Sequence, residues 1–317
     1  MSCTGELLPF TLPAMKKPTV IDALRMHRDD PNAIIAAGEL VDMRFVNGNA
    51  LSLRAAKLFC LLIQEAGVAV VENRQHRLPY SVLNETFHAS RDVLAEAVLE
   101  LHTTTISVEL VDTDGRAFTK SGPILSDVER EADTLLDAEI RFEFSPALRR
   151  VIASSTHWAA ISRRAVMAFE SKYALRLYMW LSLRAGLRKV SEDVPLDELR
   201  AMMGLSPSKL VRWQDFSRYA LDPAIAEINH LAGFRAAYEP IKRGRGFVGV
   251  RFAWGTKGRA ELAETYRELE RPRVGRVARR EGLVESIADE RRRLADGLAG
   301  AGQALHGKLD HPLQGEG

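Results

Sequence analysis

Four basic side chains crowd one short stretch of this sequence, EPIKRGRGFVGVRFAW from Glu239 to Trp254. They are Lys242, Arg243, Arg245 and Arg251. Like charges held this close repel one another, and such a cluster is best neutralised by a partner that carries many negative charges. The Gly-Arg-Gly sequence between alternating apolar residues predicts a turn between two strands. We therefore expect a hairpin whose tip presents cations to a polyanion.

A second group of polar and basic residues surrounds the start of a predicted helix at residues 213–231. Apolar residues from Phe216 to Leu231 recur at helical spacing and would face the core, which leaves the polar residues of the first turns outward. Asp222-Pro223 predicts a bend or a restart, because proline lacks a backbone donor. The alternative interpretation is that these polar residues only form the solvent-exposed face of the helix and bind nothing.

The outward residues have the side-chain types that suit a DNA groove. Arginine can form paired hydrogen bonds with guanine and glutamine with adenine, whereas serine and lysine suit phosphates. Together with the hairpin, the candidate DNA-binding residues are Lys209, Arg212, Gln214, Ser217, Arg218, Lys242, Arg243, Arg245 and Arg251.

Motifs of enzymes and metal sites do not account for the chain. GRGFVG at 244–249 matches G-x-G-x-x-G, but strand-forming residues follow it where a dinucleotide site needs a helix. No P-loop motif occurs, and the eight histidines include no H-x-H pair that could hold a metal beside a nicking tyrosine. Tyr173 and Tyr178 lie on an apolar helix and read as core, and Cys3 and Cys60 have no metal-ligand spacing. We expect no enzyme activity, no cofactor and no metal.

The elements that carry these residues follow a pattern that occurs twice along the chain. The stretches AAKLFCLLIQEAG (55–67) and ALRLYMWLSLRAG (174–186) align without a gap, and both have apolar residues at helical spacing. Each is followed by a proline that begins a compact helical turn, Pro79 in one copy and Pro195 in the other. These two features predict two helices in each copy.

A further helix and a strand pair follow in each copy. The helices are predicted at 90–101 and 213–231, after which the pattern changes to alternation around an Asp-Gly turn and around the Gly-Arg-Gly turn. This order is that of a winged helix, whose third helix can lie in the major groove of DNA. The sequence predicts an α+β, mostly helical fold of two tandem winged-helix domains, divided into an N-terminal arm (1–40), a first domain (41–150), a second domain (151–260) and a C-terminal helix with a mobile tail (261–317).

Charge distinguishes the two predicted domains. Residues 1–150 hold 16 lysines and arginines against 22 acidic residues, whereas residues 151–259 hold 18 against 9. The second domain is therefore expected to make the main DNA contact. The first offers Arg91 as a secondary contact, on a helix that also carries Asp92, Glu96 and Glu100. Interaction with protein, or a smaller share of the DNA contact, is expected there as readily as base reading.

The chain has no predicted export or membrane segment. Its first 18 residues place their lysines after the apolar residues, unlike a signal peptide. No apolar run approaches the roughly 18 residues that a membrane span needs. We expect a cytoplasmic protein with no membrane partner.

The second copy resembles a known family. The segments FESKYALRLYMWLSL, VPLDELRAMMGL and WQDFSRYALDPAIAEIN, followed by AYEPIKRGRGFVGVRFAW, look like the initiator Rep proteins of theta-replicating, iteron-containing bacterial plasmids. The resemblance covers roughly residues 40–260 and is strongest from Phe169 to Trp254. It implies a recognition helix at 213–231 and a wing at 238–252, which make the main contact to repeated origin sequences. It also implies that the first domain serves dimerisation or a secondary DNA contact.

The resemblance also implies partners and assembly. Monomers would open an origin together with a host replication initiator and helicase, whereas dimers would bind an operator inverted repeat and repress the initiator's own promoter. A winged-helix repressor without an origin function is an alternative, which tandem direct repeats beside the gene would disfavour. A rolling-circle nicking enzyme and a purely protein-binding scaffold are weaker alternatives. Nicks in supercoiled origin DNA would favour the nicking enzyme, and the absence of salt-sensitive DNA affinity would favour the scaffold.

Overall fold

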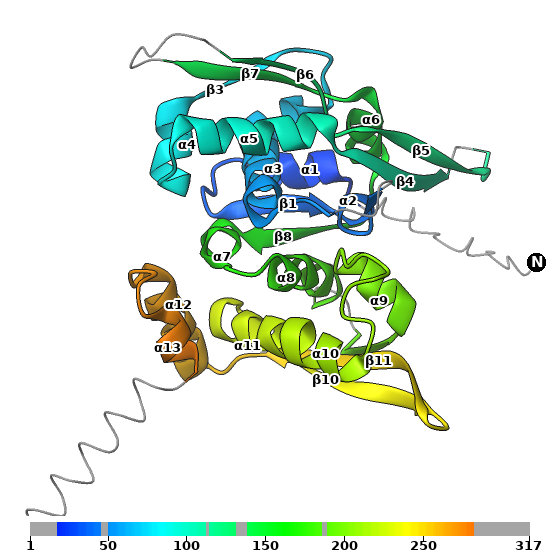
Figure 1. Cartoon of the computed structure of the whole chain (residues 1–317). Coiled ribbons are helices and arrows are strands. Elements are labelled where there is room, and N and C mark those ends of the chain that lie inside the picture. The colour runs from blue at the N-terminus through cyan, green and yellow to red at the C-terminus, as the bar shows by residue number, and fades with distance from the viewer. Residues whose placement is uncertain (1–17, 46–49, 112–113, 131–137, 186–188, 282–317) are drawn as a thin grey trace, which may run out of the picture.

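The computed structural model describes residues 18–45, 50–111, 114–130, 138–185 and 189–281. Two modules are stacked in Figure 1, the first running from α1 to α7 and the second from α8 to α13. Residues 1–17 of the predicted N-terminal arm and the tail from residue 282 lie outside the described residues. No helix within the described ranges is both long and apolar enough to cross a membrane.

The first module contains one predicted winged-helix order. Its elements are α3 (Leu53–Ala66), α4 (Tyr80–Phe87), α5 (Arg91–Thr103), β4 (Thr105–Val111) and β5 (Ala117–Pro123). The helices begin where the sequence offers start signals, since the Ser52 hydroxyl caps α3 by accepting from the backbone N–H of Ala55. Leu58, Leu83 and Leu101 are fully buried where these helices meet.

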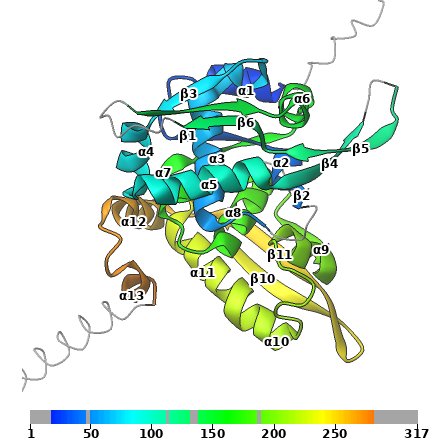
Figure 2. The same cartoon turned by 45° about the horizontal axis from the view of Figure 1, so that its top comes forward.

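The second module repeats that order, so the prediction of two winged helices is confirmed. It consists of α8 (Lys172–Ala185), β9 (Ser191–Pro195), α9 (Leu196–Met202), α10 (Trp213–Phe216), η2 (Ser217–Leu221), α11 (Asp222–Leu231), β10 (Phe234–Arg243) and β11 (Gly246–Thr256). The helix predicted at 213–231 is present as α10, η2 and α11 in succession, and we call it the recognition helix. Both hairpins, β4–β5 and β10–β11, project toward the same side of the molecule in Figures 1 and 2.

Additional elements complete the first module. They are α1 (Val20–Met26), β1 (Ala33–Ala37), α2 (Gly38–Val41), β2 (Arg44–Phe45), the 3-10 helix η1 (Gly67–Val71), β3 (His76–Pro79), β6 (Leu125–Arg130), β7 (Glu139–Phe144), α6 (Pro146–Ser154), β8 (Trp158–Ser162) and α7 (Arg163–Ala168). Strand β8 pairs antiparallel with β1, with Ile161 opposite Ile34. This pairing joins residues from both sides of the predicted boundary at 150/151, and the boundary itself stays a prediction.

The modules share a core through α8. Leu175, Leu177, Trp180 and Leu181 of this helix are all buried, and α8 contacts α3 on one side and α11 on the other. Apolar residues on several faces of one helix are typical of a helix surrounded by protein. The second winged helix therefore rests on the first through a continuous apolar contact.

The strand before the short helix pairs differently in the two modules. In the second module β9 joins the wing sheet through β11, with Val194 opposite Val250. A Cβ atom at Gly249 would lie 2.7 Å from the carbonyl oxygen of Val194, so glycine permits this close approach. In the first module β3 pairs with β7 instead, and the wing strand β4 pairs with β2.

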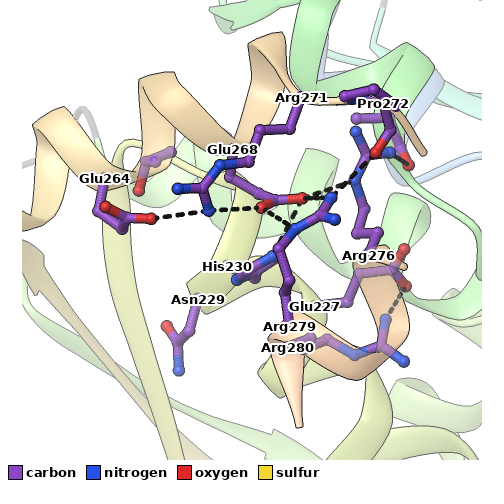
Figure 3. A network of polar contacts seen from close by, with 12 residues as sticks. Glu227, Asn229, His230, Glu264, Glu268, Arg271, Pro272, Arg276, Arg279 and Arg280 are labelled. Atoms are coloured by element: carbon purple, nitrogen blue, oxygen red, sulfur yellow. Dashed lines mark hydrogen bonds and ion pairs between the residues drawn. The ribbon is translucent and has the colours of Figure 1, made fainter. Parts of the chain in front are cut away.

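Two C-terminal helices close the second module. The closing helix predicted after Trp254 is α12 (Arg259–Glu270), and α13 (Arg276–Arg280) follows it. Figure 3 shows that Glu268 of α12 lies among basic groups: its oxygens accept from Nε of Arg276 at 3.2 Å and from Nε of Arg279 at 2.7 Å. Burial alone would raise the pKa of Glu268, but these hydrogen bonds lower it to about 2. Arg276 also donates to the carbonyl oxygen of Ala168 at 3.1 Å, so this network fastens α13 to the end of α7.

Candidate nucleic-acid interface

Arg200 fixes the turn that leads from α9 into the recognition helix. Its guanidinium donates to the carbonyl oxygens of Leu210, at 2.6 Å, and Lys209. Leu210 has a φ of 52°, a left-handed conformation that costs energy in a residue with a side chain. The two hydrogen bonds from Arg200 hold this turn closed, so the recognition helix can begin at Trp213.

The start of the recognition helix packs directly on the β10–β11 hairpin, which we call the second wing. The rings of Trp213 and Phe247 stack with centroids 4.7 Å apart and an interplanar angle of 16°. Lys242 lies opposite Phe247 in the hairpin, and its Nζ is 5.1 Å from the centre of that ring. The helix start and the end of the wing therefore adjoin each other.

Tyr238 of β10 connects the middle of the recognition helix to the wing. Its hydroxyl is hydrogen-bonded to the Ser217 hydroxyl at 2.9 Å and donates to a carboxylate oxygen of Asp222. Burial and the hydrogen bond to Asp222 raise the pKa of Tyr238 to about 12, so it keeps its proton at neutral pH. The predicted bend at Asp222-Pro223 corresponds to the π-helical turn η2, because Pro223 has no N–H to continue α-helical bonding.

Four of the residues predicted to bind DNA in the recognition helix, or just before it, are exposed to solvent, as expected. They are Lys209, Arg212, Gln214 and Arg218. The guanidinium carbon of Arg218 lies 5.5 Å from the ring of Tyr219. In the described part of the chain, Lys209, Arg212 and Arg218 form no ion pair. Their positive charge is therefore available to an anionic partner.

The wing tip presents the remaining free cations. Arg243 and Arg245 are exposed on either side of Gly244, whose φ of 63° makes the tight turn. Within the described ranges neither arginine forms an ion pair. GRGFVG thus shapes a hairpin, as predicted, because Gly246 begins β11 and no helix follows.

Two predicted residues have partners inside the protein. Arg251 makes a bidentate ion pair with Asp193, at 2.7 and 2.8 Å. Arg251 and the buried Phe252 are neighbours in β11, and successive side chains of a strand point to opposite faces of the sheet. Arg251 therefore lies on the face that is turned away from the core. Ser217 is only half-buried, but its hydroxyl is engaged by Tyr238 and donates to Asp222 at 3.0 Å. A DNA contact by Arg251 or Ser217 therefore stays a prediction, and both residues are left out of the contact surface proposed below.

The first module carries a different surface at the corresponding helix. Arg91 begins α5, and its guanidinium carbon lies 5.1 Å from the centre of the Tyr80 ring. Glu100 accepts from the Ser52 backbone N–H and hydroxyl, whereas Asp92 and Glu96 of the same helix are exposed. A secondary DNA contact through Arg91 stays a prediction, and so does dimerisation.

Sequence reasoning did not find the residues that position this surface. Arg200, Trp213, Tyr238 and Phe247 hold the turn, helix and wing together through the contacts described above. The aromatic residues were visible as members of the predicted helix and strands, but their pairing depends on the register of the bulged hairpin between Ile241 and Lys242. No described group of three or more His, Cys, Asp or Glu residues could hold a metal ion.

Comparisons with known proteins agree with this architecture. A family model described as "Initiator Replication protein, WH1" matches residues 36–182, and one described as "Initiator Rep protein, WH2" matches residues 195–254. No curated protein sequence matches the chain significantly. Among solved structures, the crystal structure of Pi initiator protein in complex with iteron DNA is similar over 71% of this chain and 98% of that chain, with a TM-score of 0.52 and 15% sequence identity.

The WH1 match spans the first winged helix and most of α8, and the WH2 match covers the remainder of the second winged helix from Pro195 to Trp254. The resemblance inferred from the sequence is thereby confirmed. This chain belongs to the family of initiator Rep proteins, the DNA-binding proteins that initiate plasmid replication.

Proposed function

We propose that the second winged helix binds the direct repeats of a plasmid origin as double-stranded DNA. The start of the recognition helix would enter the major groove, and the wing tip would contact the adjoining backbone. The observation that supports this proposal is the stacking of Trp213 on Phe247, at 4.7 Å, which joins the start of the recognition helix to strand β11 of the wing. The second wing and the recognition helix would then contact the same duplex.

The residues divide into two kinds of contact. All seven residues of the proposed contact surface are exposed. We assign phosphate contacts to Lys209, Arg212, Lys242, Arg243 and Arg245, and base-edge contacts to Gln214 and Arg218. If this module neutralises about six phosphates, log K should fall with log salt at a slope of about −5. The Pi initiator protein, crystallised with iteron DNA, has a similar fold and supports this mode of binding.

We also propose how the protein assembles and with which partners it acts. The first module serves dimerisation or a secondary DNA contact through Arg91. Monomers open the origin with a host replication initiator and helicase, and homodimers repress the promoter through an inverted repeat. The protein acts by binding and positioning DNA, without a chemical step or a cofactor. Its place of action is the bacterial cytoplasm, where the plasmid replicates.

The test is a binding titration with the direct repeats beside the gene and with a scrambled duplex of the same length. We expect tight, sequence-dependent binding and a salt slope near the predicted value. The Arg218→Ala variant should lose about 1 to 3 kcal/mol on the repeat, and a substituted base pair at one position should abolish the difference between variant and wild type. Equal loss on every sequence would place Arg218 among the phosphate contacts. Salt-independent or undetectable binding by the wild type would contradict the proposed function.

A further inference from the structure

An apolar side chain stands in the middle of the basic surface at the start of the recognition helix. Val211 is 68% exposed, between Lys209 and Arg212, which are also exposed. Burying a valine typically stabilises a protein by 1.5 kcal/mol or more, so this side chain contributes little to folding where it stands. Its exposure therefore needs a partner or is incidental.

The protein fixes the backbone on both sides of Val211. Arg200 holds the carbonyl groups of Lys209 and Leu210, and Trp213 is stacked on the wing. Leu210 keeps a left-handed conformation just before Val211. A side chain held in this way meets a docked ligand with little further loss of conformational freedom.

The major groove of DNA offers one apolar group to such a side chain. That group is the C5-methyl of thymine, whereas the minor groove shows no methyl at all. The other exposed apolar residues of this surface are less well placed: Tyr219 lies beside the guanidinium of Arg218, and Val248 belongs to the wing. Val211 alone among these three precedes the helix start that the proposed function places in the major groove.

We propose that Val211 contacts the C5-methyl group of one thymine in each repeat and so selects thymine at that position. The inference rests on the proposed function, because it needs the recognition helix to lie in the major groove. Burial of one methyl group against Val211 accounts for an affinity ratio of about fourfold. Val211 is then a specificity residue that acts without a hydrogen bond.

The experiment replaces each thymine of the repeat in turn by uracil, which lacks only the methyl group. Affinity is measured for the wild type, for Val211→Ala and for Val190→Ala. Val190 is the matched control, since it is also 68% exposed in the second module but precedes β9, and its carbonyl group bonds to Trp254 at the far end of the wing sheet. Neither substitution removes a buried group, so all three proteins should fold alike.

The proposal expects one thymine at which uracil weakens the wild type and Val190→Ala about fourfold and leaves Val211→Ala unchanged. It is overturned if uracil weakens Val211→Ala as much as the wild type at every position, or if no position responds in the wild type. A wild type that does not bind the thymine-containing repeat at all would instead contradict the proposed function, so the two failures are distinguishable.

Discussion

The two winged-helix modules differ in the connection that leads to the long helix. In the first module residues 88–90 connect α4 to α5, and His88 has a left-handed φ of 48°; in the second the longer segment 203–212 connects α9 to α10, and both Gly204 and Leu210 are left-handed, with φ of 73° and 52°. The side chain of Arg200 bonds to this longer segment, whereas Asn84, at the aligned position in the first module, accepts from the N–H of His88 with its backbone carbonyl oxygen at 2.7 Å. A common order of elements thus contains connections of different length with different supports.

The long helices also differ in what they face. The recognition helix is fastened to its wing by Trp213 and Tyr238 and leaves its cations free. In the first module Glu100 of α5 bonds to Ser52, and the wing pairs with β2. The two modules thus share the order of their elements but differ in what their long helices contact.

The largest effect is expected from the network that closes only the second module. Glu268 is 1% exposed and joins Arg276 and Arg279, so Glu268→Gln should remove the negative charge that neutralises the buried Arg276 and lower the free energy of unfolding by about 3 to 5 kcal/mol. Glu270→Gln is the control, since Glu270 is exposed and its ion pair with Arg164, at 3.7 Å, should contribute less than about 1 kcal/mol. Urea unfolding of the three proteins at pH 7 measures both values.

The pH dependence of this effect has a definite sign. The pKa of Glu268 is lowered from 4.5 to about 2, so its contribution is complete above pH 4.5 and is lost as the pH falls through 2. The stability difference between wild type and Glu268→Gln should therefore shrink as the pH is lowered from 5 toward 2. A difference that grows on acidification would contradict this account of the network.

The next effect tests the turn. Arg200→Ala removes two charge-assisted hydrogen bonds and should lower affinity for every duplex by about thirtyfold, or roughly 2 kcal/mol. Asn84→Ala, at the aligned position of the first module, should change affinity by less than about twofold. Fluorescence anisotropy with the origin repeat gives both numbers. Equal losses in the two variants would break the proposed distinction between the modules.

A smaller effect is expected at the wing tip. The double substitution Arg243→Ala and Arg245→Ala should lower affinity about tenfold at physiological salt on all sequences and flatten the salt slope by about 2. Lys120→Ala in the wing of the first module is the comparison and should leave the slope nearly unchanged. An unaltered slope in the double variant would remove the wing tip from the phosphate contacts.

The smallest effect should come from Arg91. Because acidic residues share α5 with it, Arg91→Ala should weaken binding to the repeat by less than about twofold. A loss of tenfold or more, measured in the same anisotropy assay, would show that the first module takes a major part in DNA contact. The two modules would then not differ, as we propose, in their share of the DNA contact.

Much of this arrangement follows from local patterns in the sequence. Helical spacing of apolar residues, Pro195 before α9 and the turn at Gly244 are signals carried by a few neighbouring residues, and they led to the correct order of elements. The exposed residues Arg212, Gln214 and Arg243 followed from the same patterns. Such features depend on the period of one helix or strand.

Features that depend on distant residues did not follow from the sequence. The partner of Arg251 is Asp193, 58 positions away on β9, and this strand was not predicted because its five residues show no clear alternation. The hydrogen bonds from Arg200 to the turn depend on the left-handed conformation of Leu210, and no sequence pattern predicts that conformation for a leucine. The pairing of β8 with β1 likewise joins segments more than a hundred residues apart.

The central claim is that the recognition helix and the second wing contact one duplex from the same side. Hydroxyl-radical footprinting of the origin repeats, with wild type and with the Arg243→Ala, Arg245→Ala double variant, tests it most directly. The account predicts that the wild type protects each repeat and an adjoining backbone segment, and that only the adjoining segment loses protection in the double variant. Identical footprints for the two proteins, at concentrations that saturate both, would contradict it.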